Sequence, residues 1–143
     1  MKRNLLGALL LLFLLPAPAL SAAATGSGEV PSYVLRGLKD YETKGYEAAV
    51  RTWLAGSPYE PATEMVSRIA FFKNIEKLYG KYTHHDIVFT KQTPTSNQAY
   101  IRMNFERTSG YILFTSARRN HKWVLSDIDL DRMQKYGSNA PRS

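Results

Sequence analysis

The chain has 143 residues, of which 44% are hydrophobic and 22% are charged, and its formal net charge is +7. This length suits one small domain, and the apolar, aromatic-rich composition excludes a disordered chain. The sequence contains no cysteine. Its absence excludes a disulfide scaffold, a thiolate zinc site, a thiol nucleophile and a lipid-modified N-terminal cysteine.

Residues 1–24 have the pattern of a cleaved secretory signal. A short basic start precedes the apolar run Leu5–Leu15, and prolines and small residues follow it. A helix of that length reaches about 16 Å, half of a bilayer core, so stable membrane insertion is not expected. Cleavage after Ala19, Ser21 or Ala24 fits the small residues equally well. The pattern predicts export to the periplasm or the cell exterior.

The rest of the chain divides into three parts. Residues 25–31 form a Gly- and Ser-containing flexible lead-in, and residues 134–143 lack periodicity and form a flexible tail. Between them, residues 32–133 are long enough for a single core. We therefore expect one domain and no further unit in the chain.

Ser32–Leu54 follows a helical period, with Ser32 as a candidate N-cap. Gly45 either bends this helix or divides it in two, and because the apolar phase continues through Gly45, one bent helix is favoured. A turn at 56–61 leads to a second helix, Ala62–Tyr79, which Gly80 ends. The apolar stripe of that helix consists of Met65, Ile69, Phe72, Ile75 and Tyr79.

The period then changes to two, which predicts antiparallel strands joined by short turns. The expected strands are Asp86–Gln92, Gln98–Arg107, Tyr111–Ala117 and Lys122–Leu130. Ile87 and Phe89 are expected to share one face of the first strand, and Ile101, Met103 and Phe105 one face of the second. Two helices followed by such a meander predict an α+β domain, with the helices packed on one face of a curved four-stranded antiparallel sheet.

Three strings of packing and turn residues run through the domain. They are Tyr41-Glu42-x-x-Gly45-Tyr46-x-x-Ala49-x-x-x-Trp53-Leu54-x-Gly56-Ser57-Pro58, Ile75-Glu76-x-x-Tyr79-Gly80-x-Tyr82 and Trp123-Val124-Leu125. With the order of the elements, they resemble the cystatin-like, nuclear transport factor 2-like α+β cones, specifically small exported bacterial proteins of unassigned function, over about residues 33–131. Some members of that wider group are isomerases, cyclases or dehydratases with an acidic or histidine residue in the cone, and others only bind or assemble. The resemblance therefore implies a fold and leaves the function open.

Two carboxylates fall within the apolar faces of the predicted helices. Glu76 projects close to Phe72, and Glu42 projects between Leu38 and Trp53. A charge against a core is costly unless it is paired or hydrogen-bonded. Each carboxylate is therefore either a pocket acid or base, or a buried polar anchor, and the anchor is favoured because buried polar groups are usually just satisfied. If Gly45 ends the first helix, the projection of Glu42 onto an apolar face fails, and Glu76 is the only one of the two candidates left.

Other kinds of site are not expected. His84 and His85 are adjacent, so in a strand they point to opposite faces, and no metal or cofactor site is predicted. The motifs of serine hydrolases, phosphate loops and dinucleotide-binding folds are absent. The basic residues are scattered singly, apart from Arg118-Arg119 at an expected hairpin tip, so nucleic acid is not an expected partner.

The function expected first is that of a non-catalytic exported domain that binds a small apolar ligand or a partner protein. Binding would use the cone interior or the open sheet face, through which a homodimer is also expected. The alternative is a small cofactorless enzyme of the isomerase or dehydratase type, with Glu76 as general base and Tyr79 or Tyr100 as hydrogen-bond donor. The residues expected to line the site are Glu42, Trp53, Phe72, Glu76, Tyr79 and Tyr100.

Overall fold

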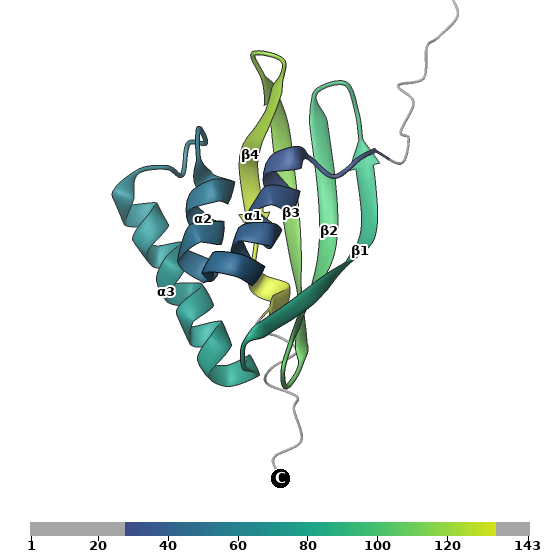
Figure 1. Ribbon diagram of the computed structural model, residues 1–143. Coiled ribbons are helices and arrows are strands. Elements are labelled where there is room, and N and C mark those ends of the chain that lie inside the picture. Colours follow the sequence, from purple (N-terminus) through teal and green to yellow (C-terminus); the bar gives the residue numbers. More distant parts are fainter. Residues whose placement is uncertain (1–27, 134–143) are drawn as a thin grey trace, which may run out of the picture.

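The computed structural model describes residues 28–133, in which helices come first and an antiparallel sheet follows. The predicted signal peptide, residues 25–27 of the lead-in and the tail at 134–143 lie outside the described residues. The elements are α1 (Ser32–Lys44), α2 (Tyr46–Leu54), α3 (Ala62–Tyr79), β1 (Tyr82–Gln92), β2 (Ser96–Phe105), β3 (Ser109–Arg119) and β4 (Lys122–Asp129). The helices lie on one side of the sheet, and α1 crosses in front of it (Figure 1). The predicted α+β class is confirmed.

The expectation of one bent helix over Ser32–Leu54 is wrong, because Gly45 ends α1 and starts α2. Gly45 has φ 93° and ψ 176°, a conformation that favours glycine, and its N–H donates to the carbonyl of Tyr41 at 3.1 Å. The expected cap is wrong as well: Ser32 is the first helical residue, Pro31 precedes it, and no side chain caps the helix. The positive φ of Gly45 divides the helix even though the helical period of the apolar residues continues through this position.

The second predicted helix is confirmed as α3, with Gly80 at its C-terminus (φ 83°). Phe72, Ile75 and Tyr79 are its buried residues, and the earlier turns are only partly covered. The helix therefore packs on the rest of the domain chiefly through its last two turns. Among the described residues, no helix has both the length and the apolarity needed to cross a membrane.

The sheet is an antiparallel meander in the order β1-β2-β3-β4. Ile101, Met103 and Phe105 are buried beneath the helices, as predicted, and Asn120 and His121 form the β3–β4 turn with positive φ. The observed strands differ from the expected ranges mainly at their ends, because side-chain alternation does not mark where pairing begins. β1, for example, starts at Tyr82, which pairs with Phe105.

A β-bulge in β1 overturns the predicted pairing of its side chains. Ile87 pairs with Ile101 and Phe89 with Tyr100, so Val88 is an extra residue on β1. Ile87 consequently lies on the helix side of the sheet and Phe89 on the opposite side, whereas strict alternation placed them together. The bulge has no clear signal in the alternating sequence.

Candidate functional site

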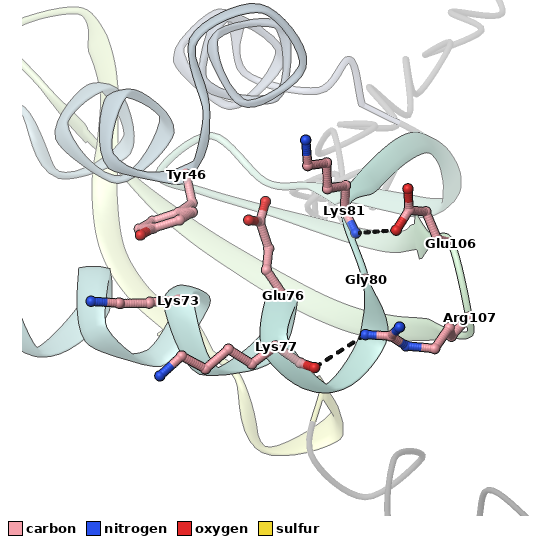
Figure 2. Close-up of a pocket in the computed structure, with 8 residues that line it drawn as sticks. All are labelled: Tyr46, Lys73, Glu76, Lys77, Gly80, Lys81, Glu106 and Arg107. Carbon is pink, nitrogen blue, oxygen red and sulfur yellow. Dashed lines mark hydrogen bonds between the residues drawn. The ribbon is translucent and has the colours of Figure 1, made fainter.

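Two adjoining pockets meet at Glu76, at the junction of the helices with the start of β1. They have volumes of about 240 Å³ and 390 Å³, and both are lined by Glu76 and Lys81. The smaller pocket is lined by Tyr41, Glu42, Thr43, Gly45, Glu76, Lys81 and Tyr82. The larger pocket, drawn in Figure 2, is lined by Tyr46, Lys73, Glu76, Lys77, Gly80, Lys81, Glu106 and Arg107.

Two glycines place these side chains together. Gly45 turns the chain between α1 and α2, so that the last turn of α1 and the first residue of α2 face the C-terminal part of α3. Gly80 ends α3 and sends the chain directly into β1, which brings Lys81 and Tyr82 beside Glu76. Both glycines have positive φ, 93° and 83°, which side chains with a Cβ rarely adopt. The site therefore depends on two backbone conformations that favour glycine.

Tyr41 forms the wall of the smaller pocket. Its side chain is 3% exposed, and its ring centroid lies 4.6 Å from that of Tyr82 and 5.8 Å from that of Phe72. The hydroxyl is buried and makes no hydrogen bond of ordinary geometry within the described part of the chain. Burial raises the pKa of Tyr41, and the charge and hydrogen-bonding capacity of the nearby Glu76 raise it further. The hydroxyl therefore keeps its proton and remains a donor.

Glu76 is half-buried on α3. Figure 2 shows its carboxylate pointing into the pocket between Tyr46 and Lys81, whereas the ammonium groups of Lys73 and Lys77 extend away from it. Among residues 28–133, Glu76 forms no ion pair within 4 Å. A carboxylate with one open side and cations around the rim is available to a ligand.

Glu42 is not where a continuous helix would have put it. It is exposed and forms an ion pair with Lys39 at 3.1 Å, because the break at Gly45 removes the helix face that was expected to cover it. The interpretation of Glu42 as a carboxylate set against the core is wrong. It nevertheless lines the smaller pocket together with Glu76, so the two predicted carboxylates do share a site, one at its rim and one inside.

Trp53, Phe72 and Tyr79 belong to the packed core between the helices and the sheet. The centroids of Trp53 and Phe72 lie 5.6 Å apart, and both rings are fully buried. The Tyr79 hydroxyl donates to the carbonyl of Met133, so it is already engaged. None of the three lines either of the pockets at Glu76. We therefore assign these side chains to packing.

Tyr100 is separated from those residues by the sheet. It pairs with Leu113 on β3 and Phe89 on β1, and its ring stacks on Tyr111 with centroids 5.3 Å apart at 15°. Its neighbours on β2, Ala99 and Ile101, are the residues that face the core. The prediction that Tyr100 lines the same interior as Trp53 is wrong, because it lies on the face of the sheet away from the helices.

The histidines follow the prediction of opposite faces. His84 pairs with Asn104 and His85 with Met103, which lie on opposite sides of β2. His85 Nδ1 is 2.8 Å from the Tyr82 hydroxyl, and burial lowers the pKa of His85. Within residues 28–133, no group of three or more metal-ligating side chains comes together.

Sequence reasoning missed Tyr41, Tyr82 and Lys81. The tyrosines stand beside or near the two glycines, in the strings Tyr41-Glu42-x-x-Gly45 and Gly80-x-Tyr82. A glycine break next to an aromatic residue was the available signal. The sequence does not show which of these glycine breaks lie close together in the folded chain. The fold is needed to find that.

Comparisons with known proteins add no assignment. No family model matches the chain, and neither the curated proteins nor the solved structures give a significant match. The proposed function therefore depends on the site itself.

Proposed function

We propose that this protein is an exported, non-catalytic binding domain whose ligand is a small zwitterion, with an ammonium group at one end and a carboxylate at the other. The ammonium group would bind at Glu76 in the smaller pocket, and the carboxylate would face the lysines of the larger one. Export rests on the signal pattern of residues 1–24. Binding rests on the geometry at Glu76.

The Tyr41 hydroxyl is the observation that carries this proposal. A buried polar group without a partner costs about 1–3 kcal/mol, so a protein rarely retains one without a use. Tyr41 lines a pocket of about 240 Å³ that also contains Glu76, and its hydroxyl is buried. A ligand ammonium group bound at Glu76 would donate a hydrogen bond to the Tyr41 oxygen and so complete the site.

The chemistry of the lining selects the ligand class. An ammonium group would pair with Glu76 and lie near the rings of Tyr41 and Tyr82, which attract cations through their faces. Lys73 and Lys77 lie one helical turn apart on the rim of the larger pocket and would attract an anionic group. A molecule with both charges matches both pockets, whereas an amine or an acid alone matches only one.

A matched ligand set tests this proposal. We expect 4-aminobutyrate to bind more tightly than n-butylamine or butyrate, as measured by isothermal titration calorimetry. Glu76→Gln should weaken binding of 4-aminobutyrate and of n-butylamine by about tenfold, which corresponds to about 1.4 kcal/mol. A double Lys73→Gln/Lys77→Gln variant should weaken binding of 4-aminobutyrate and leave n-butylamine unaffected.

Glu64→Gln is the matched control, since Glu64 is exposed on the first turn of the same helix. Both glutamate variants should keep the free energy of unfolding within about 0.5 kcal/mol of the parent. Equal affinities in the Glu76 and Glu64 variants, or no binding by any of the three probes, would contradict the proposed function.

A cofactorless enzyme remains the second candidate because Glu76 stands beside a proton donor in a pocket open to solvent. The donor is Tyr41, in place of the expected Tyr79 or Tyr100. Such an enzyme would exchange solvent deuterium into the carbon next to the carbonyl of a keto-acid probe such as levulinate. Exchange that Glu76→Gln abolishes, followed by proton NMR, would favour the enzyme over the binding domain.

A further inference from the structure

The edge strand β1 carries a run of three exposed apolar side chains. Ile87, Val88 and Phe89 are consecutive and are 49%, 49% and 47% exposed. β1 ends the sheet, and among the described strands it pairs only with β2. A strand edge that pairs with no second described strand is a template for another strand. Proteins usually protect such an edge with lysine or proline, and β1 has one lysine, Lys91, near its end.

The bulge at Val88 decides which side chains can face a second strand. Because it inserts one residue, the alternation of faces reverses across it. From His84 to the end of β1, the register with β2 therefore places four side chains on the helix side and four on the opposite side. The helix side carries His85, Ile87, Thr90 and Gln92, and the opposite side carries His84, Asp86, Phe89 and Lys91.

We propose that β1 pairs antiparallel with β1 of a second copy of this chain, which joins the two sheets across a two-fold axis. Directly opposed residues must lie on the same face. When Val88 is opposite the partner's Phe89, the pairs on either side of the bulge in each copy satisfy this condition. Ile87 is then opposite the partner's Thr90, and both lie on the helix side.

The same register makes the charges complementary. It places Asp86 opposite the partner's Lys91, twice by symmetry. Asp86 Oδ2 already accepts hydrogen bonds from Arg102 at 2.8 and 3.1 Å and from Asn104 at 2.9 Å, while Oδ1 makes none within the described residues. Lys91 is exposed and forms no ion pair there. The nearest alternative with matched faces places Asp86 opposite the partner's Phe89 and loses both charge pairs.

The dimer should be weak. Pairing through a single strand edge covers less surface than a standard permanent interface, so the two copies would exchange. The two charge pairs lie at the surface, and added salt should therefore weaken the dimer. This assembly uses neither the pockets at Glu76 nor the stacked Tyr100 and Tyr111.

Sedimentation velocity of the purified protein over a concentration series tests this proposal. Lys91→Glu places like charges opposite one another at both ends of the interface and should raise the dimer dissociation constant by at least about tenfold. Val88→Lys, in the middle of the exposed edge, should abolish the dimer. Lys122→Glu, the same charge change on the opposite edge strand, should leave the constant unchanged.

Lys91 is exposed, so its variant keeps the test valid even if Val88→Lys fails to fold. A protein that stays monomeric at every concentration would overturn the proposal. A dimer that Tyr111→Arg disrupts and Lys91→Glu does not would overturn it as well, since association would then use the open sheet face.

Discussion

Gly37 on α1 lies directly against the indole ring of Trp53 on α2. A Cβ at Gly37 would overlap Nε1 and Cδ1 of the ring, and the same Nε1 donates a 3.1 Å hydrogen bond to the carbonyl of Val34. The two short helices can approach this closely because position 37 has no side chain. This contact fixes the angle between α1 and α2, which the break at Gly45 does not set by itself. It therefore positions the end of α1 at the pocket.

Gly37→Ala should destabilise the protein by about 1–2 kcal/mol net, because overpacking in a fixed core costs about 1–3 kcal/mol. The gain in helix propensity, about 1 kcal/mol, offsets only part of that cost. Urea denaturation measures the effect. In a Trp53→Phe background the smaller ring makes room, so the loss should shrink, and an equal loss in both backgrounds would contradict the close contact.

The helices and strands could be predicted where the hydrophobic periodicity is clear over many residues. α3 and the buried face of β2 follow from the spacing of residues such as Phe72, Ile75 and Ile101. The break at Gly45 and the bulge at Val88 could not be predicted in the same way. Each is a change in backbone conformation at a single residue. The apolar pattern is compatible with the chain with or without that change, and tertiary packing decides which conformation forms.

The site was predictable only in part, since Glu76 could be found from its place in an apolar stripe. Glu42 was found for a reason that the structure does not bear out, because it lies at the pocket rim and is exposed. Tyr41 and Tyr82 come from different elements and meet only after folding, with ring centroids 4.6 Å apart. One helical projection cannot show a contact between two elements.

Acid should destabilise the protein through His85. Burial lowers the pKa of His85 below 6.5, and the charges of Asp86 and Glu42 oppose that shift only in part. The unfolded chain therefore binds a proton at a higher pH than the folded one does, and stability present above about pH 6.5 is lost as the pH falls through the folded pKa. His85→Gln should flatten the dependence of the unfolding free energy on pH below neutrality. His84→Gln, a change at an exposed position, is the control, and equal slopes in the two variants would contradict this assignment.

Alkali should destabilise the protein through buried tyrosines. Burial raises the pKa of Tyr33 from 10.0 to about 12, although its hydrogen bond to Ser116 opposes the shift, and burial also raises the pKa of Tyr41 and Tyr82. These groups ionise first in the unfolded chain. Stability should therefore hold below about pH 10 and fall as the pH rises towards 12. Phenolate absorbance measured beside the urea midpoint checks this, and Tyr33→Phe should reduce the slope. Phenolate formation complete by about pH 10 without loss of structure would contradict it.

Tyr41→Phe tests the central claim, that the pocket at Glu76 is a binding site, most directly. Removing a buried hydroxyl that lacks a partner should leave the free energy of unfolding unchanged or raise it by up to about 1 kcal/mol. The same change should weaken binding of 4-aminobutyrate by about fivefold or more, since the ligand ammonium group loses the hydroxyl oxygen that accepts its hydrogen bond. A variant that loses stability and binds the probe as well as the parent would show that the hydroxyl serves the fold, and it would contradict the account.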